Sequence, residues 1–218
     1  MMKPGRITGK QAVIFDMDGV LVDSEPLHDW SFQRVVEEIG YPDHGIRIDD
    51  YLGKSDAMLW RDFLAKNKSE HTAERLTARR EEFFLEALRK EVPIFPGLRQ
   101  LLHDLQPNYK IALASGSSRQ MVDGVILGAS LESFFPIRIS IDEVKHGKPD
   151  PEIFLKAAGA LCVSPDHCVV VEDSTAGIEA AHRAGMLAIA ITNSLPAAKL
   201  GHADYVVKNY EEIKRLLL

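Results

Sequence analysis

The stretch Val13-Ile14-Phe15-Asp16-Met17-Asp18-Gly19 decides the fold. The apolar run at residues 12–15 predicts a short buried strand. It leads directly into Asp16 and Asp18, which share one side of the chain if the extended conformation continues. Two acids at the end of a buried strand repel each other and resist desolvation, so the pattern favours a cation between them or a chemical role. Gly19 then lets the chain turn sharply, because glycine has no β-carbon to clash.

Taken alone, this acidic pattern is weak, because acidic turns with glycine are common in loops. A calcium-binding loop of the D-x-D-x-D-G type is excluded, since its glycine falls later and residues 20–22 are too apolar for an oxygen cage. The pattern becomes informative only if phosphate or metal chemistry recurs at later strand ends.

Length and composition describe an ordinary globular protein with one domain and a sizeable insertion. The chain has 218 residues, 45% hydrophobic and 27% charged. Its 26 Lys and Arg against 32 Asp and Glu give a net charge of −6, which argues against nucleic acid or an anionic membrane as partner. We expect a monomer, and a small anionic substrate is compatible with this net charge because a local cation can outweigh it.

Targeting features also point to the cytoplasm. No apolar run approaches the length of a membrane span, and residues 1–10 lack the apolar core of a signal peptide. Cys162 and Cys168 have no metal-type spacing, and we interpret both as packing residues rather than as a disulfide or zinc site.

Residues 24–92 show helical periodicity without a convincing strand. Apolar residues predict one helix around 32–39 that Gly40 ends, a second around 59–64, and a third around 76–88. From Pro96 onward, helices and strands alternate. The predicted strands are 109–114, 137–140, 168–171, 187–191 and 205–207, and the predicted helices are 98–105, 120–127, one capped by Asp150 with Pro151 in its first turn, 175–184 and 211–217.

Repeated βα units predict a parallel sheet with helices on both faces. The fold class is therefore α/β, a Rossmann-like three-layer core formed by residues 1–23 and 93–218. Residues 24–92 are an all-helical insertion after the first strand. Such sheets bind ligands at the carboxyl ends of their strands.

Two segments, one at a strand end and one at the entrance of a helix, carry groups suited to an anion. Ser115-Gly116-Ser117-Ser118 follows a buried strand, so Ser115 and the free amides beyond it can bind a phosphate. The alternative is a helix cap at Ser117 or Ser118, and both roles can hold at once. Lys148, between Gly147 and Pro149, is a point charge suited to phosphate, although lone loop lysines are usually solvated.

A second acidic strand end lies at Glu172 and Asp173, after three valines that indicate a buried strand. Hard oxygen ligands at a phosphate site suit Mg²⁺, which uses few protein carboxylates together with water and phosphate oxygens. A capped helix starting at Asp173 or Ser174 is the alternative. Because Asp16 and Asp18 are also available, we favour the metal site.

The ordered motifs Asp-x-Asp, Ser, Lys and Glu-Asp make the chain similar to the haloacid dehalogenase superfamily over nearly its whole length. It most resembles the helically capped sugar-phosphate phosphatases and beta-phosphoglucomutases. This resemblance implies that the insertion is a cap domain. It also implies that Asp16 is the nucleophile that forms an aspartyl-phosphate, and that Asp18 is the general acid and base.

The same resemblance implies roles for the remaining motif residues. Ser115 and the Gly116 amide would hold the transferring phosphoryl group, and Lys148 would neutralise charge around it. Gly19 and Ser117 would line the phosphate site. The Mg²⁺ ligands would be Asp16, the Asp18 carbonyl, Asp173 and Glu172, the last directly or through water. The acid at Asp18 argues against dehalogenase chemistry.

Substrate choice is implied to lie in the cap. For His28, a structural role and hydrogen bonding to the substrate are equally compatible with the sequence. Residues Gly53, Lys54 and Ser55 resemble the substrate-specificity loop of the cap. Mutases carry an arginine just after that serine, where this chain has Asp56. We therefore predict a magnesium-dependent phosphatase of sugar phosphates or related metabolites. A phosphomutase is the alternative, and a phosphoglycolate phosphatase is a more distant one. A non-catalytic binding module is disfavoured, because no motif residue is missing.

Overall fold

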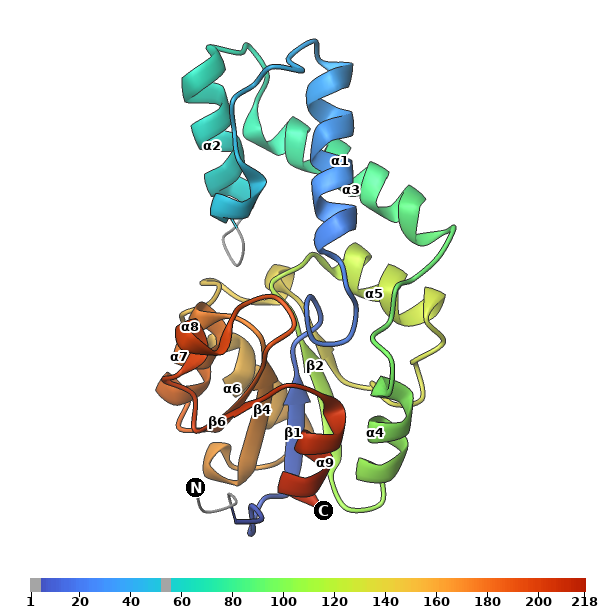
Figure 1. Cartoon of the computed structure of the whole chain (residues 1–218), viewed down its shortest axis with the longest axis vertical. Helices are drawn as coiled ribbons and strands as arrows, with labels where there is room; N and C mark the ends of the chain where they lie inside the picture. The colour runs from blue at the N-terminus through green and yellow to red at the C-terminus, as the bar shows by residue number, and fades with distance from the viewer. Residues whose placement is uncertain (1–4, 52–55) are drawn as a thin grey trace. The chain divides into compact units, whose positions relative to one another are not determined.

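The chain divides into two compact units (Figure 1). Residues 1–23 with 93–218 form the sheet unit, and residues 24–92 form the helical unit. The computed structural model describes residues 5–51 and 56–218. The predicted specificity-loop residues Gly53, Lys54 and Ser55 therefore lie outside the described residues.

The sheet unit is built on six parallel strands, which confirms the predicted α/β fold class. Their spatial order is β3-β2-β1-β4-β5-β6. The strands are β1 Ala12–Phe15, β2 Lys110–Ala114, β3 Arg138–Ile139, β4 Cys168–Glu172, β5 Leu187–Ile191 and β6 Tyr205–Val207.

Helices cover both faces of this sheet (Figure 1). On one face, α6 packs against β1, β2 and β3, and α7 packs against β4 and β5. On the other, α4 and α9 pack against each other. The helices of this unit are α4 Leu98–Leu105, α5 Arg119–Gly128, α6 Glu152–Leu161, α7 Thr175–Arg183, α8 Ala197–Leu200 and α9 Tyr210–Leu217. Short 3-10 turns lie at Ile141–Glu143 and Pro165–His167.

The register of the central strands places the two acidic strand ends together. Phe15 is paired with Val171 in the parallel β1–β4 ladder. The next residues along the two strands are Asp16 and Glu172, so both carboxylates emerge at the same edge. Strand order also reverses between β1 and β4, which is where sheets of this kind bind ligands.

The helical unit has an aromatic core of its own. Its helices are α1 Glu25–Glu38, α2 Asp56–Asn67 and α3 Ala73–Leu88, with a 3-10 turn at Ile48–Tyr51. Phe32, Trp60 and Phe63 are fully buried and contact one another, with ring centroids 5.1 to 6.4 Å apart. As predicted, α1 ends before Gly40, which adopts a left-handed φ of 83°.

Two local predictions need correction. Pro151, not Asp150, is the N-cap of α6, although the Asp150 carboxylate accepts a hydrogen bond from the Glu152 amide. Cys162 is exposed at the end of α6, so only the buried Cys168 is a packing residue; both thiols are free. The short helix α8 was not predicted, because its four residues are too few to show a helical period. Among the described residues, no helix has the length and apolarity to cross a membrane.

His44 is a buried histidine that helps to hold the helical unit together. Its Nδ1 accepts a hydrogen bond of 3.0 Å from the Ile46 amide, and its ring lies edge-on to Phe32 with centroids 5.0 Å apart. Burial lowers the pKa of His44, and nearby Lys66 lowers it further against the opposing carboxylates of Asp43 and Asp29. The folded unit therefore favours the neutral form of this imidazole.

Acidification should destabilise the helical unit through His44. Because the pKa of His44 is lower in the folded state, the unfolded chain binds more protons, and stability is lost as the pH falls below about 6.5. We expect the His44→Asn variant to be less stable at pH 8 but to show a shallower loss towards pH 5.5. Denaturant titrations followed by Trp30 and Trp60 fluorescence measure this. The exposed His103→Asn serves as control, and equal pH slopes in all three proteins would contradict the prediction.

Candidate active site

The turn after β1 fixes the first acid at the edge of the sheet. The Asp16 amide continues the β1–β4 ladder by donating to the Val171 carbonyl at 3.0 Å. Gly19 has a left-handed φ of 72°, and a β-carbon there would lie 1.8 Å from Oδ2 of Asp173. Two reasons therefore require glycine at position 19: its left-handed backbone conformation and the close approach of the Asp173 side chain.

Two later segments anchor the same turn, and neither was predicted. The Asn193 side chain donates to the Gly19 carbonyl at 2.7 Å, and the Tyr210 hydroxyl donates to the Val20 carbonyl at 2.6 Å. The Ser194 hydroxyl hydrogen-bonds Asp173. The polar run Thr192-Asn193-Ser194 that follows the apolar strand β5 is the signal that could have indicated this role.

Lys148 joins the two acidic strand ends. Its Nζ lies 2.6 Å from Oδ1 of Asp16 and 2.6 Å from Oε1 of Glu172. The lysine side chain is only 11% exposed, and Nζ also lies 5.0 Å from the ring centroid of Phe154. The sequence was compatible with either a solvated or a phosphate-binding Lys148. In the structure, this lysine is buried and pairs with two carboxylates.

The charges in this cluster do not balance. Asp16, Glu172 and Asp173 are buried carboxylates with Lys148 as their shared close cation. Burial raises the pKa of Asp16 to about 7 against the opposing effect of Lys148, and burial together with Glu172 and Asp16 raises the pKa of Asp173. Burial alone would lower the pKa of Lys148, but Asp16 and Glu172 raise it above its ordinary value.

This imbalance fits a divalent cation. Asp16, Glu172 and Asp173 each offer a carboxylate oxygen, and these atoms lie within 4.8 Å of one another. Hard oxygen donors with excess negative charge are suited to Mg²⁺ or Ca²⁺ and unsuited to soft metals. A cation here would offset the burial and the mutual repulsion that raise the pKa of Asp16 and Asp173.

The serine motif lies beside the second acid of the opening stretch. Ser115 is fully buried, and its Oγ accepts a hydrogen bond of 3.0 Å from the Ser117 amide. The Ser117 hydroxyl donates to Oδ2 of Asp18 at 2.7 Å. Ser118 caps α5 by accepting from the Met121 amide, so the helix-cap alternative is correct for Ser118. The position of a β-carbon on Gly116 has no atom within 4 Å.

In the helical unit, His28 and Asp56 have structural partners. The His28 ring stacks on Phe84 with centroids 4.6 Å apart, and its carbonyl accepts from Nη2 of Arg80 at 3.1 Å. Nη1 of Arg80 pairs with the Asp56 carboxylate. Asp56 is therefore charge-neutralised, which weakens the argument that it repels a second phosphate. Together, the Asp56 carboxylate and the His28 carbonyl engage both terminal nitrogens of Arg80.

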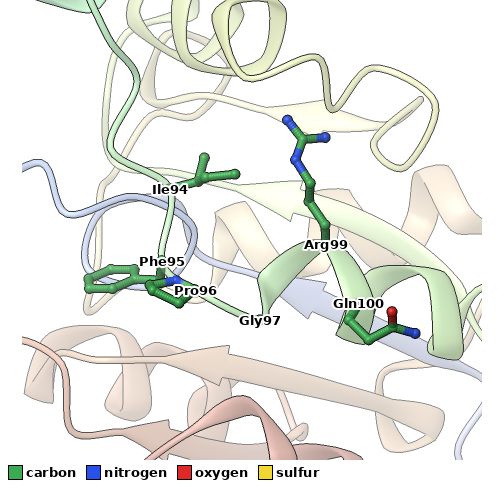
Figure 2. A pocket seen from close by; sticks show the side chains of 6 residues that line it. All are labelled: Ile94, Phe95, Pro96, Gly97, Arg99 and Gln100. Atoms are coloured by element: carbon green, nitrogen blue, oxygen red, sulfur yellow. The ribbon is translucent and has the colours of Figure 1, made fainter.

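A surface pocket lies where the chain re-enters the sheet unit (Figure 2). It is lined by Ile94, Phe95, Pro96, Gly97, Arg99 and Gln100. None of the predicted site residues belongs to it, and the Arg99 guanidinium donates to the carbonyls of Ala129 and Ser130. We therefore place the candidate site at the acidic strand ends and not in this pocket.

A parallel sheet with buried carboxylates and a lysine at its switch point defines an α/β enzyme. Residues 10–185 match the family described as haloacid dehalogenase-like hydrolase. The phosphorylated carbohydrates phosphatase of Thermotoga maritima is 36% identical over 181 residues, which cover 81% of this chain and 82% of the relative. The beta-phosphoglucomutase of Bacillus subtilis is 34% identical over 216 residues, which cover 95% and 93%.

Solved structures agree with these relatives. A crystal structure of beta-phosphoglucomutase from Clostridium difficile has a TM-score of 0.80 and 26% identity, covering 95% of this chain and 96% of that one. The chain belongs to the haloacid dehalogenase-like hydrolases. It is an enzyme of the group that contains phosphatases and phosphomutases, as the sequence motifs predicted.

Removing one buried charge should stabilise the protein without metal and abolish its response to metal. We expect Asp173→Asn to raise the melting temperature in chelator by about 3 °C or more, because it removes a carboxylate that burial and two neighbouring acids disfavour. Millimolar Mg²⁺ should raise the melting temperature of the wild type but not of the variant.

Differential scanning calorimetry with chelator and with Mg²⁺ measures both effects. The exposed Glu132→Gln is the matched charge-removal control and should respond to Mg²⁺ like the wild type. An Asp173→Asn protein that Mg²⁺ stabilises as much as the wild type would show that this carboxylate holds no cation.

Proposed function

We propose that the chain is a magnesium-dependent phosphatase that hydrolyses small phosphorylated metabolites, above all sugar phosphates, through an aspartyl-phosphate on Asp16. The observation that carries the proposal is the Asp16 carboxylate, held by Lys148 at the carboxyl end of β1 beside Asp173. A carboxylate in this place can attack phosphorus only if nearby positive charge offsets the repulsion between two anions.

The first half-reaction forms the intermediate. Oδ1 of Asp16 accepts a hydrogen bond from Lys148, which leaves Oδ2 as the attacking atom. A bond forms from Oδ2 to phosphorus, and the bond from phosphorus to the ester oxygen breaks. Asp18 gives its proton to the departing alkoxide, so the product leaves as an alcohol. The Ser117 hydroxyl, donating at 2.7 Å, orients the Asp18 carboxylate for this transfer.

The second half-reaction restores the enzyme. Asp18 takes a proton from water, the water oxygen attacks phosphorus, and the bond to Asp16 Oδ2 breaks to release inorganic phosphate. Ser115, the Gly116 amide and Lys148 hold the phosphoryl oxygens in both steps, with Gly19 and Ser117 lining the site.

Mg²⁺ would be held by Asp16, Asp173 and the Asp18 carbonyl, next to Glu172. When bound, it supplies charge neutralisation for the phosphoryl group and for the clustered carboxylates. The fit rests on the close set of carboxylate oxygens and on the raised pKa values of Asp16 and Asp173.

The helical unit, residues 24–92, would act as the cap that selects the substrate, with His28 and residues 53–55 as candidate contacts. The Thermotoga relative, a phosphatase of phosphorylated carbohydrates, supports sugar phosphates as the substrate class. Arg80 is engaged with Asp56 and the His28 carbonyl, so it is not free to grip a second phosphate as a mutase requires. We expect a cytoplasmic monomer.

Phosphate release from a panel of hexose, pentose and nucleoside phosphates, with phosphoglycolate included, tests the proposal. Asp16→Asn should lower the rate on the best substrate by at least about 10³-fold, because an amide cannot form the intermediate. Glu132→Gln should retain full activity. Excess chelator should abolish phosphate release, and added Mg²⁺ should restore it. Wild-type rates in Asp16→Asn, or activity that survives chelation, would refute the mechanism.

The phosphomutase is the second candidate, because the Bacillus relative is a beta-phosphoglucomutase. Incubation with beta-glucose 1-phosphate and a trace of the 1,6-bisphosphate separates the two. We expect free phosphate and no accumulation of glucose 6-phosphate. Isomerisation without phosphate release would establish the mutase and show that other residues supply the distal phosphate site.

A further inference from the structure

Glu172 is a fully buried carboxylate whose two oxygens are both engaged. Oε1 accepts from Nζ of Lys148 at 2.6 Å. Oε2 accepts from the amides of Asp173 and Ser174 at 2.8 Å each, and from the Ser174 hydroxyl at 2.9 Å. Four donors thus define the position of this side chain, and three of them come from the start of α7.

Ser174 links the helix to the carboxylate. Its Oγ accepts from the Gly177 amide at 3.0 Å, which caps α7, and donates to Oε2 of Glu172. The hydroxyl that starts the helix therefore also orients the glutamate. The free amides and positive dipole end of α7 stabilise the negative charge in the same place.

Gly177 provides the space that the glutamate occupies. A β-carbon at this position would lie 1.7 Å from Oε1, 2.0 Å from Cδ and 2.6 Å from Oε2 of Glu172. Its φ is outside the left-handed region, so the backbone itself does not need glycine here. Glycine has one of the lowest helix propensities. Its presence in the first turn of α7 is explained by the Glu172 carboxylate, which occupies the space that a side chain would need.

We propose that Gly177 and Ser174 are positioning residues of the active site: they fix Glu172, Glu172 fixes Lys148, and Lys148 fixes the nucleophilic carboxylate of Asp16. Nζ of Lys148 lies 2.6 Å from each of its two partners, so the lysine cannot keep both distances if Glu172 moves. The catalytic consequence rests on the proposed function, whereas the steric linkage does not.

The matched test compares Gly177→Ala with Gly159→Ala. Gly159 lies exposed inside α6, and its β-carbon would have no atom within 4 Å. Gly177→Ala should lower kcat about 10²-fold with KM changed less than about threefold, and should lower the melting temperature by about 5 °C or more. Gly159→Ala should match the wild type in activity and melt no lower.

The serine and glutamate variants keep the proposal testable if Gly177→Ala fails to fold. Ser174→Ala should lower kcat with little change in KM, and Ser174→Thr, which keeps the hydroxyl, should restore most of it. Shortening the carboxylate by one methylene relieves the clash, so the Glu172→Asp/Gly177→Ala double variant should melt above Gly177→Ala alone. Additive losses in that cycle, or a Gly177→Ala protein equal to Gly159→Ala, would overturn the proposal.

The two levels of inference fail differently. If the wild type releases no phosphate from any substrate while the melting temperatures still couple Gly177 to Glu172, the proposed function is wrong and the positioning linkage stands. If the wild type is active and Gly177→Ala and Ser174→Ala are equally active, the positioning proposal is wrong and the function stands. A crystal structure of Gly177→Ala should show a Lys148–Glu172 distance well beyond 2.6 Å.

Discussion

Like-charge repulsion at the ends of β1 and β4 is the constraint around which the rest of the sheet unit is arranged. Asp16, Glu172 and Asp173 are buried, each with a carboxylate oxygen within 4.8 Å of the others, and Lys148 bridges Asp16 and Glu172. Hydrophobic side chains alone would expel such a cluster to solvent. It stays buried because the apolar strands β1 and β4 hold its backbone and because Lys148 and specific hydrogen-bond donors offset part of its charge.

The surrounding structure supplies those donors from widely separated segments. The start of α7 gives three hydrogen bonds to Glu172, and the loop before α6 gives Lys148. The turn after β1 approaches so closely that Gly19 leaves no room for a side chain against Asp173. Each element contributes one to three polar groups, so the site depends on the sheet being assembled in register.

Local sequence patterns predicted the elements of the fold well. The apolar runs before Asp16 and Glu172 gave both central strands, and helical spacing gave α1, α2 and α3, because burial imposes its period on nearby residues. Patterns of this kind could not show that Lys148 bridges Asp16 and Glu172, or that Arg80 neutralises Asp56, since those contacts join residues 24 to 132 positions apart. The sequence alone could not explain Gly177, because its role depends on the direction of the Glu172 side chain.

The hydroxyl of Tyr210 holds the turn after β1 across a separation of 190 residues. During synthesis on the ribosome, that turn and its two aspartates therefore emerge long before the helix that anchors them. Pairing of β1 with β4, its neighbour in the sheet, also requires that the later residues of β4 have been synthesised. In a nascent chain, the turn that follows the proposed nucleophile Asp16 therefore stays without this hydrogen bond until α9 has left the exit tunnel.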